Sequence, residues 1–214
     1  AYRPPVLDMF EPQDHPHDLE DPGGPPKAPY DVTGYTLSYQ MGIKFDRSLD
    51  GFEAPTTRVP DLISVTPGSV KGSGGAGWLV SHETNASFTL TNRLLKAGAP
   101  VFWLKDGAKA GPNGGKVAFG AGAIWIPASP AAKAVIAQGV KDLGIDAYAV
   151  GARPSGAAIA LKPVRVGLVD VYGGSRPSGW NRWMFEKFEA PFQVVYPRRR
   201  DAGDIAKDFD VRVF

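Results

Sequence analysis

Polar residues and glycines gather directly after the apolar run at residues 164–171, where a ligand site is expected. In an open α/β sheet, ligands bind at the carboxyl end of a strand, before the amino terminus of the next helix. The residues in this position are Asp170, Tyr172, Gly173, Gly174, Ser175, Arg176, Ser178 and Asn181. Their spacing matches neither the G-x-G-x-x-G fingerprint nor the phosphate-binding loop with its lysine. We therefore expect a crevice for a small anion, a sugar or a peptide end.

Catalysis is not indicated by these residue types. A catalytic role would need an acid–base partner of suitable pKa, and no histidine lies near this segment in the sequence. The chain contains no cysteine, which excludes a thiolate nucleophile, a thiolate metal site and a disulfide bond. It also contains no G-x-S-x-G motif of the kind that presents a nucleophilic serine. We expect no catalytic residue in this chain.

The segment that would position the crevice predicts a parallel sheet with crossover helices. Strands are expected at residues 164–171, 192–196 and 210–214, with a helix at 179–188 and a short helix before the last strand. Ser178 is expected to cap the longer helix, and Trp180, Trp183, Met184 and Phe188 to form its buried face. Because no helix follows the final strand, we expect an incomplete sheet that belongs to a larger protein and self-associates through the edge at Phe214.

The middle of the chain predicts a further α/β subdomain. Strands are expected at residues 77–81, 100–105 and 116–126, the last interrupted at Gly120 and Gly122. One helix should start near Thr84 or Asn85 and stop at Gly98, and another should run from Ser129 and Pro130 to Gly144. Gly139 lies on the apolar stripe of this second helix, which predicts close packing against a sheet.

The first part of the chain predicts an extended arm. Residues 1–70 are rich in proline and acid, a composition that favours polyproline-like chain over helix. Tyr30, Tyr35, Leu37, Tyr39, Met41, Ile43 and Phe45 supply apolar surface, so the arm is expected to wrap around a neighbour. Glycines at 72–77 mark a loop or flexible joint. The predicted domains are therefore 1–70, 71–163 and 164–214.

Composition indicates a folded chain without a nucleic-acid partner. Of 214 residues, 43% are hydrophobic and 21% are charged, and the net charge is only +2. The one basic run, at residues 198–200, is followed by acids and predicts a solvated loop. No apolar run approaches the roughly 20 residues needed to cross a bilayer, and no signal peptide is recognised at the amino end.

Several stretches carry a resemblance to a known family. Residues 166–183 (VGLVDVYGGSRPSGWNRW) and 189–197 (EAPFQVVYP) resemble the class I glutamine-amidotransferase-like domain of large bacterial zinc carboxypeptidases. Residues 8–16 (DMFEPQDHP), 23–26 (GGPP), 29–37 (PYDVTGYTL) and 40–42 (QMG) are similar to the segment after the catalytic domain of those proteins. Residues 79–85 (LVSHETN) and 92–98 (NRLLKAG) fit as well. The similarity covers nearly the whole chain in collinear order.

The resemblance implies an α/β fold of glutamine-amidotransferase-like or flavodoxin-like type, preceded by the arm. It also implies a secreted or periplasmic parent protein that binds zinc in a peptidase domain upstream of this segment. Within the chain, His17 and Glu20 form the H-x-x-E pattern of that family, with His15 nearby, and Asn92–Arg93 resembles its carboxylate-binding pair. The third zinc histidine of the family follows that pair, whereas His82 precedes it. We therefore expect no metal or cofactor in this chain.

Two functions remain open. The first is a non-catalytic scaffold and interaction segment of a secreted zinc carboxypeptidase-like protein, with the upstream peptidase domain as its partner. The second is an independent module that binds a small ligand in the crevice at Gly173 and Gly174. A segment of the first kind should expose a large apolar patch, and a self-sufficient module should not.

Overall fold

The computed structural model describes residues 3–11, 17–28, 36–41, 43–59, 62–110 and 117–214. The chain forms two units, Ala1–Pro60 and Asp61–Phe214. It is an α/β protein with flanking helices, as predicted, and parallel strand pairing is concentrated near its carboxyl end. The glutamine-amidotransferase-like or flavodoxin-like assignment and the three domain boundaries stay predictions.

The first unit contains little regular structure. Its described residues form two short helices, α1 (Arg3–Phe10) and α2 (Leu37–Gln40), and one isolated bridge between Leu19 and Pro26. The Phe45 ring contacts those of Phe10 and Tyr39, with centroids 5.7 and 5.3 Å apart. Part of the apolar surface that we expected to wrap a neighbour is therefore used inside the unit. Tyr30 and Tyr35 lie outside the described residues, and the wrapping arm stays a prediction.

The second unit is built on a six-stranded sheet of order β1-β7-β2-β6-β3-β8. These strands are β1 (Val70–Lys71), β2 (Gly77–Val80), β3 (Phe102–Leu104), β6 (Ile124–Pro127), β7 (Ala147–Val150) and β8 (Ala158–Ala160). Only β1 and β7 pair in parallel, and the other pairs in this sheet are antiparallel. The predicted strands at 77–81 and 100–105 are confirmed, and the expected interruption at Gly120 and Gly122 separates β5 (Val117–Phe119) from β6.

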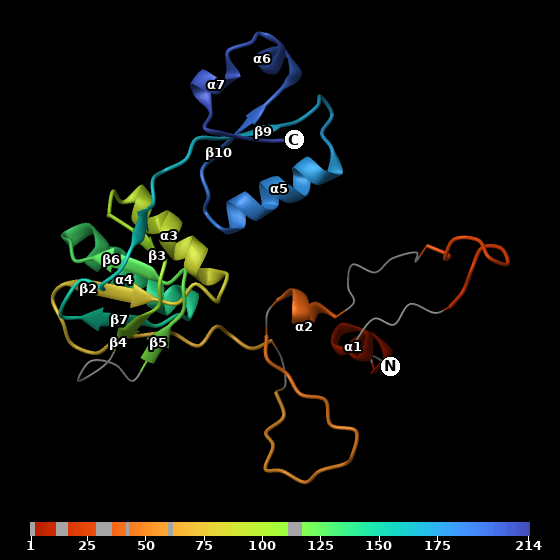
Figure 1. Ribbon diagram of the computed structural model, residues 1–214, viewed down its shortest axis with the longest axis horizontal. Coiled ribbons are helices and arrows are strands. Elements are labelled where there is room, and N and C mark those ends of the chain that lie inside the picture. Colours follow the sequence, from red (N-terminus) through yellow and green to blue (C-terminus); the bar gives the residue numbers. More distant parts are fainter. Residues whose placement is uncertain (1–2, 12–16, 29–35, 42, 60–61, 111–116) are drawn as a thin grey trace. The chain divides into compact units, whose positions relative to one another are not determined.

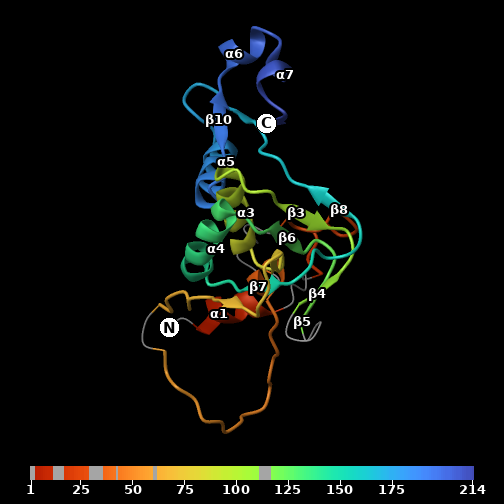
Figure 2. The ribbon, with the colours of Figure 1, turned by 90° about the vertical axis from the view of Figure 1, so that its left-hand side faces the viewer.

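Both faces of this sheet are covered, which explains why its strands are almost continuously apolar. Helices α3 (Ala86–Lys96) and α4 (Pro130–Leu143) lie side by side on one face (Figures 1 and 2) and bury Val80 and Ile126. A hairpin of β4 (Ala108–Ala110) and β5 covers the other face and buries Leu79 and Trp125. Strand β4 was not predicted. Residues 111–116, between β4 and β5, lie outside the described residues.

The helix ends of this subdomain follow the sequence signals closely. The Ser129 hydroxyl accepts a hydrogen bond from the Ala132 amide at 3.1 Å, and Gly144 ends α4 with φ at +64°. Helix α3 ends before Gly98, whose φ is +71°. The expectation that Gly139 packs on a sheet was wrong. A Cβ atom at Gly139 would lie 2.6 Å from Leu90 Cδ1, so this glycine lets α4 approach α3.

The glycine-rich segment at 72–77 is a loop up to Ala76, as predicted, and Gly77 starts β2. The segment is not a loose joint. A Cβ atom at Gly74 would lie 2.2 Å from the Val150 carbonyl carbon, and one at Gly77 would lie 2.2 Å from the Ile126 carbonyl oxygen. Here glycine permits close backbone approach to β7 and β6. The segment is held against the sheet at both positions.

The carboxyl-terminal part forms the predicted parallel sheet, in the order β10-β9-β11. It consists of β9 (Val166–Val169), β10 (Phe192–Val195) and β11 (Val211–Val213), connected by α5 (Arg176–Lys187), α6 (Pro197–Asp201) and α7 (Ile205–Asp208). In both views α5 lies on one side of β9 and β10, whereas α6 and α7 lie on the other (Figures 1 and 2). The basic run at 198–200 lies in α6, not in the predicted loop.

Two expectations for α5 were wrong. The helix is capped by Ser175 rather than Ser178, because Pro177 fits the first turn and places the cap two residues before the proline. Trp180, Trp183 and Met184 are exposed rather than buried. The inward stripe is instead Ser178, Asn181, Phe185 and Phe188, spaced by three, four and three residues.

Candidate functional site

The predicted ligand site lies between the end of β9 and the start of α5. Asp170 follows β9 directly and is 6% exposed. Its carboxylate accepts a hydrogen bond from the Val171 amide at 2.8 Å. The neighbouring Ser178 hydroxyl, together with the Val171 and Ser175 amides, lowers the pKa of Asp170. The carboxylate is therefore turned into its own loop, where it organises the turn into α5.

The two serines also have structural tasks. The Ser175 hydroxyl accepts a hydrogen bond from the Ser178 amide at 3.2 Å and so caps α5. The Ser178 hydroxyl is buried near Asp170, but no described group meets hydrogen-bond geometry with it. Of the eight predicted ligand residues, Asp170, Ser175 and Ser178 thus serve the strand-to-helix turn first.

The outer surface of the same turn remains open. Gly173 and Gly174 have φ of +90° and +78°, and a Cβ atom at either position would meet nothing within 4 Å. The Tyr172 ring stacks on Tyr196 at the adjacent strand end, with centroids 5.3 Å apart and planes at 9°. This arrangement offers a flat aromatic surface at the strand ends. On α5, Arg176 is exposed and Asn181 is half-buried. The outer surface can contact a ligand but contains no paired acid and base.

The metal-binding candidates do not form a cluster where they are described. His17 and Glu20 are exposed, and His15 lies outside the described residues. Among the described residues, no three histidine or acidic side chains are grouped so as to hold a metal ion. His82 lies in the loop after β2, as expected, where its ring faces Gly122.

The Asn92–Arg93 pair is occupied within the chain. The Asn92 amide donates to the Phe188 carbonyl at 2.8 Å. The Arg93 guanidinium donates to the Glu189 carboxylate at 2.7 to 3.1 Å and to Asp142 at 3.3 Å. These bonds raise the pKa of Arg93 and lower that of Glu189, because each charge stabilises the other. The pair joins α3 to the segment after α5 instead of facing a substrate.

An exposed aromatic surface lies on α5, where a buried face was predicted from the sequence. We call Trp180, Trp183 and Met184 the α5 aromatic face. Trp180 and Trp183 are 69% and 53% exposed, and their rings meet edge to face with centroids 6.0 Å apart. The Lys187 ammonium lies 5.8 Å from the Trp183 ring. Two stripes of α5 carry aromatic residues, so spacing alone did not identify the inward one.

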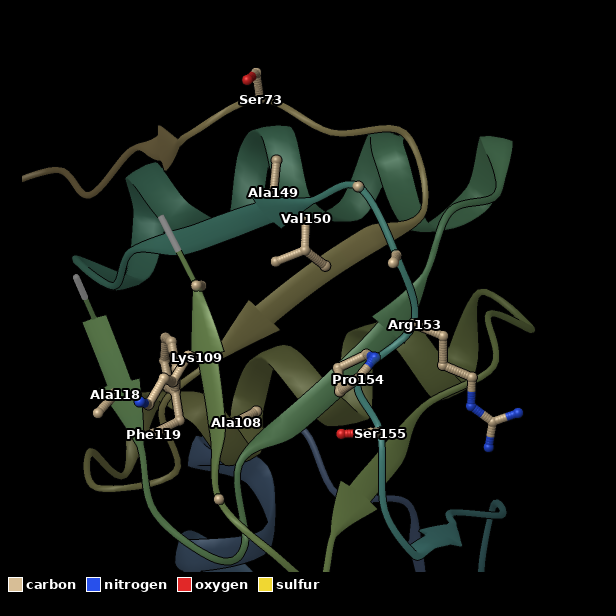
Figure 3. Close-up of a pocket in the computed structure, with 14 residues that line it drawn as sticks. Ser73, Ala108, Lys109, Ala118, Phe119, Ala149, Val150, Arg153, Pro154 and Ser155 are labelled. Carbon is tan, nitrogen blue, oxygen red and sulfur yellow. The ribbon is translucent and has the colours of Figure 1, made fainter. Parts of the chain in front are cut away.

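A cavity of about 740 Å³ lies beside the β4–β5 hairpin. Its charged lining residues are Lys109 and Arg153, which Figure 3 shows on separate segments with Arg153 directed away from the hairpin. The Arg153 guanidinium lies over the Phe102 ring, 5.8 Å from its centroid. The described lining contains no acid and no histidine. This cavity therefore has no acid–base pair for catalysis.

Comparisons with protein-family models, with curated proteins and with solved structures find no match to this chain. Within the part of the chain that the structure describes, no helix has the length and apolar character required to cross a membrane.

Proposed function

We propose that this chain is a non-catalytic scaffold and interaction segment of a secreted or periplasmic zinc carboxypeptidase-like protein. The zinc and the removal of C-terminal residues from peptides belong to the peptidase domain of that parent. The proposal rests on the sequence resemblance and on one structural observation, the exposed α5 aromatic face. Exposed clusters of large apolar side chains mark protein interaction sites, and tryptophan is enriched among the residues that dominate binding energy.

The polar groups favour the same interpretation. Asn92 and Arg93 hold Phe188 and Glu189, and Asp170 and Ser175 hold the turn into α5. Side chains that are already bound within the chain are poorly suited to act on a substrate. They are well suited to fix the position of α5, because both ends of the helix are then held.

The coding sequence on either side of Ala1 and Phe214 tests the parent protein. We expect an adjacent peptidase domain with an H-x-x-E motif and a third, later histidine that complete a zinc site. Flanking sequence without such a domain would refute the proposal.

The interaction itself is tested by calorimetry between this chain and the separately produced peptidase domain. Replacing both tryptophans, Trp180→Ser with Trp183→Ser, should weaken binding at least about tenfold, as expected for aromatic side chains at the centre of an interface. Lys133→Ala, an exposed change on α4, is the matched control and should leave binding unchanged. If the unsubstituted chain, the double tryptophan variant and Lys133→Ala all bind the peptidase domain with equal affinity, the α5 aromatic face is not the interface.

The second candidate is a small-ligand module at the glycine turn, and the Tyr172–Tyr196 stack favours it. Flat aromatic pairs beside open backbone can hold a sugar ring or a planar anion. Titration with glucose and with benzoate, followed by tyrosine fluorescence, tests this function. Saturable binding that is lost in Tyr172→Ala would support the module. No binding of either probe up to about 10 mM, a concentration above the dissociation constants of specific complexes, would exclude these two ligand classes.

A further inference from the structure

A second large cavity lies within the Asp61–Phe214 unit, at the place where the six-stranded sheet is linked to β9. Its volume is about 920 Å³. Pockets that bind small organic molecules span roughly 300 to 1,000 Å³, so the cavity has the size of a ligand site. It is bordered by α3, the ends of β3 and β8, the linker at 161–164 and the turn at 189–191. Neither the glycine turn nor the α5 aromatic face contributes to it.

The walls of this cavity are mainly apolar. The apolar lining residues are Phe88, Leu95, Trp103, Ala160, Leu161, Pro163, Val164, Val166, Ala190 and Pro191. Phe88 and Trp103 are 43% and 38% exposed, which is high for large rings in a folded domain. Water against such walls is readily displaced by an apolar ligand.

Most polar groups of the lining are already bound. The Thr91 hydroxyl donates to the Ser87 carbonyl at 2.9 Å, and the Asn92 amide donates to the Phe188 carbonyl at 2.8 Å. The Glu189 carboxylate accepts hydrogen bonds from the Arg93 guanidinium. These groups contribute no free charge to a ligand in the cavity.

The remaining polar lining groups are two lysines, Lys96 at the end of α3 and Lys162 in the linker. Both are exposed, and neither forms an ion pair with any described residue. Lys96 also helps to lower the pKa of Glu189, which places its positive charge near that end of the cavity. The cavity thus combines apolar walls with two cationic groups.

We propose that this cavity binds a small amphiphilic anion, with an apolar body along Phe88 and Trp103 and a carboxylate between Lys96 and Lys162. The apolar walls select against small inorganic anions, which would lose hydration without gaining contacts. The two ammonium groups select against neutral apolar molecules. Ligand binding would also connect α3 with the turn at 189–191, because both line the cavity.

Calorimetric titration of the full chain with decanoate and with decanol tests the proposal. We expect saturable binding of one decanoate per chain, and binding of decanol that is at least about tenfold weaker, because the alcohol lacks the charge-assisted bonds. The double change Lys96→Gln with Lys162→Gln should reduce decanoate affinity at least about tenfold while leaving decanol affinity within about twofold. Lys133→Gln with Lys141→Gln, on the surface of α4, is the matched control and should change neither.

Two further variants locate the site. Ala190→Phe should fill the cavity and weaken decanoate binding, with circular dichroism and the melting transition checking that the variant is folded. Trp180→Ser with Trp183→Ser should leave decanoate binding unchanged. The proposal is overturned if decanoate does not saturate, if decanol binds as tightly, if the cavity lysines have no more effect than the control lysines, or if the α5 variant abolishes binding.

Discussion

At the scale of single residues, four arginines of the second unit, Arg93, Arg165, Arg199 and Arg200, bind carboxylates of the same chain. Arg93 pairs with Glu189 and Asp142, and Arg165 pairs with Asp210. Glu189 adopts φ of +54°, a left-handed conformation that disfavours a residue with a side chain. The Arg93 pair gives a physical reason for an acid at this strained position, since glycine would relieve the backbone but lose the hydrogen bonds from the Arg93 guanidinium.

The Arg165–Asp210 pair predicts a dependence of stability on pH. Arg165 donates to Asp210 through its backbone amide and its guanidinium, at 2.7 to 3.1 Å, which lowers the pKa of Asp210 from 3.8 to about 2. A carboxyl group whose pKa is lowered on folding stabilises the protein above its unfolded pKa, and this contribution is lost as the pH falls toward the folded pKa.

Asp210→Asn should therefore lower the melting temperature by a few degrees near neutral pH. The difference in melting temperature between Asp210→Asn and the unsubstituted chain should persist down to about pH 5. It should shrink as the pH falls from 3.8 toward 2. Melting curves of both proteins across this range provide the measurement. Asp201→Asn is the control and should show a smaller difference, because among the described residues its carboxylate pairs with the adjacent Arg200 alone. A difference for Asp210→Asn that stays constant down to pH 2 would contradict the assigned pairing.

Zinc binding gives a second prediction at the residue scale. His17 and Glu20 are exposed, and the Glu20 backbone amide donates to the Pro25 carbonyl at 3.0 Å. Tight zinc sites need three or four convergent ligands with orienting partners. After dialysis against zinc-free buffer, elemental analysis should find well under one zinc per chain. Equimolar retained zinc that disappears in Glu20→Ala would overturn this expectation.

At the scale of elements, the two stripes of α5 differ in their energetic roles. The Phe185 ring packs on Phe192 of β10, with centroids 5.3 Å apart, whereas Trp183 faces outward beside Lys187. Phe185→Ala should reduce the free energy of unfolding by about 1–3 kcal/mol, less than for a fully buried ring because Phe185 is only half-buried. Trp183→Ala should change it by no more than about 0.5–1 kcal/mol. Denaturant titrations measure both values. A larger loss of unfolding free energy for Trp183→Ala than for Phe185→Ala would show that Trp183 is buried, as predicted from the sequence.

Two glycines near the start of β2, Gly77 and Gly75, should respond differently to substitution by alanine. Gly77→Ala should destabilise the fold by about 1–3 kcal/mol or more, because the new methyl group would lie 2.2 Å from the Ile126 carbonyl oxygen. Gly75→Ala, two residues earlier, is the matched control because a Cβ atom there would meet nothing within 4 Å. It should be neutral or slightly stabilising. Equal effects in thermal melts would mean that the loop is as loose as the sequence indicated.

Local signals in the sequence predicted local structure well, and packing was predicted less well. Ser129, Pro130 and Gly144 specify the ends of α4 through backbone chemistry that needs no distant partner. The face that α5 buries depends on the sheet beneath it, and the aromatic residues of the helix fit either orientation. The glycine turn was correctly placed after β9, but the inward orientation of Asp170 depends on Ser178 and on amides that only the folded turn brings together.

At the scale of the whole molecule, the two sheets of the second unit differ in the size of their cores. The six-stranded sheet buries side chains on both faces, whereas the three-stranded sheet buries mainly Leu168, Val195 and Phe209. Its outer strands are β10 and β11, and Phe214 beside β11 is 83% exposed. Among the described residues, β11 pairs only with β9, which leaves one edge of its backbone available.

This edge is expected to drive self-association. Light scattering at several protein concentrations should show an average mass that rises above 22.8 kDa as concentration increases. Val211→Lys places a charge on the exposed strand and should reduce the association, because two copies would then bring like charges together along the paired edges. Trp183→Ser tests the alternative, association through α5. If the strand edge is responsible, this variant should show the same average mass as the unsubstituted chain at each concentration.

A chain that remains monomeric at all concentrations would show that neither surface pairs with a second copy. If only Trp183→Ser abolishes association, the α5 aromatic face, rather than the strand edge, brings the copies together.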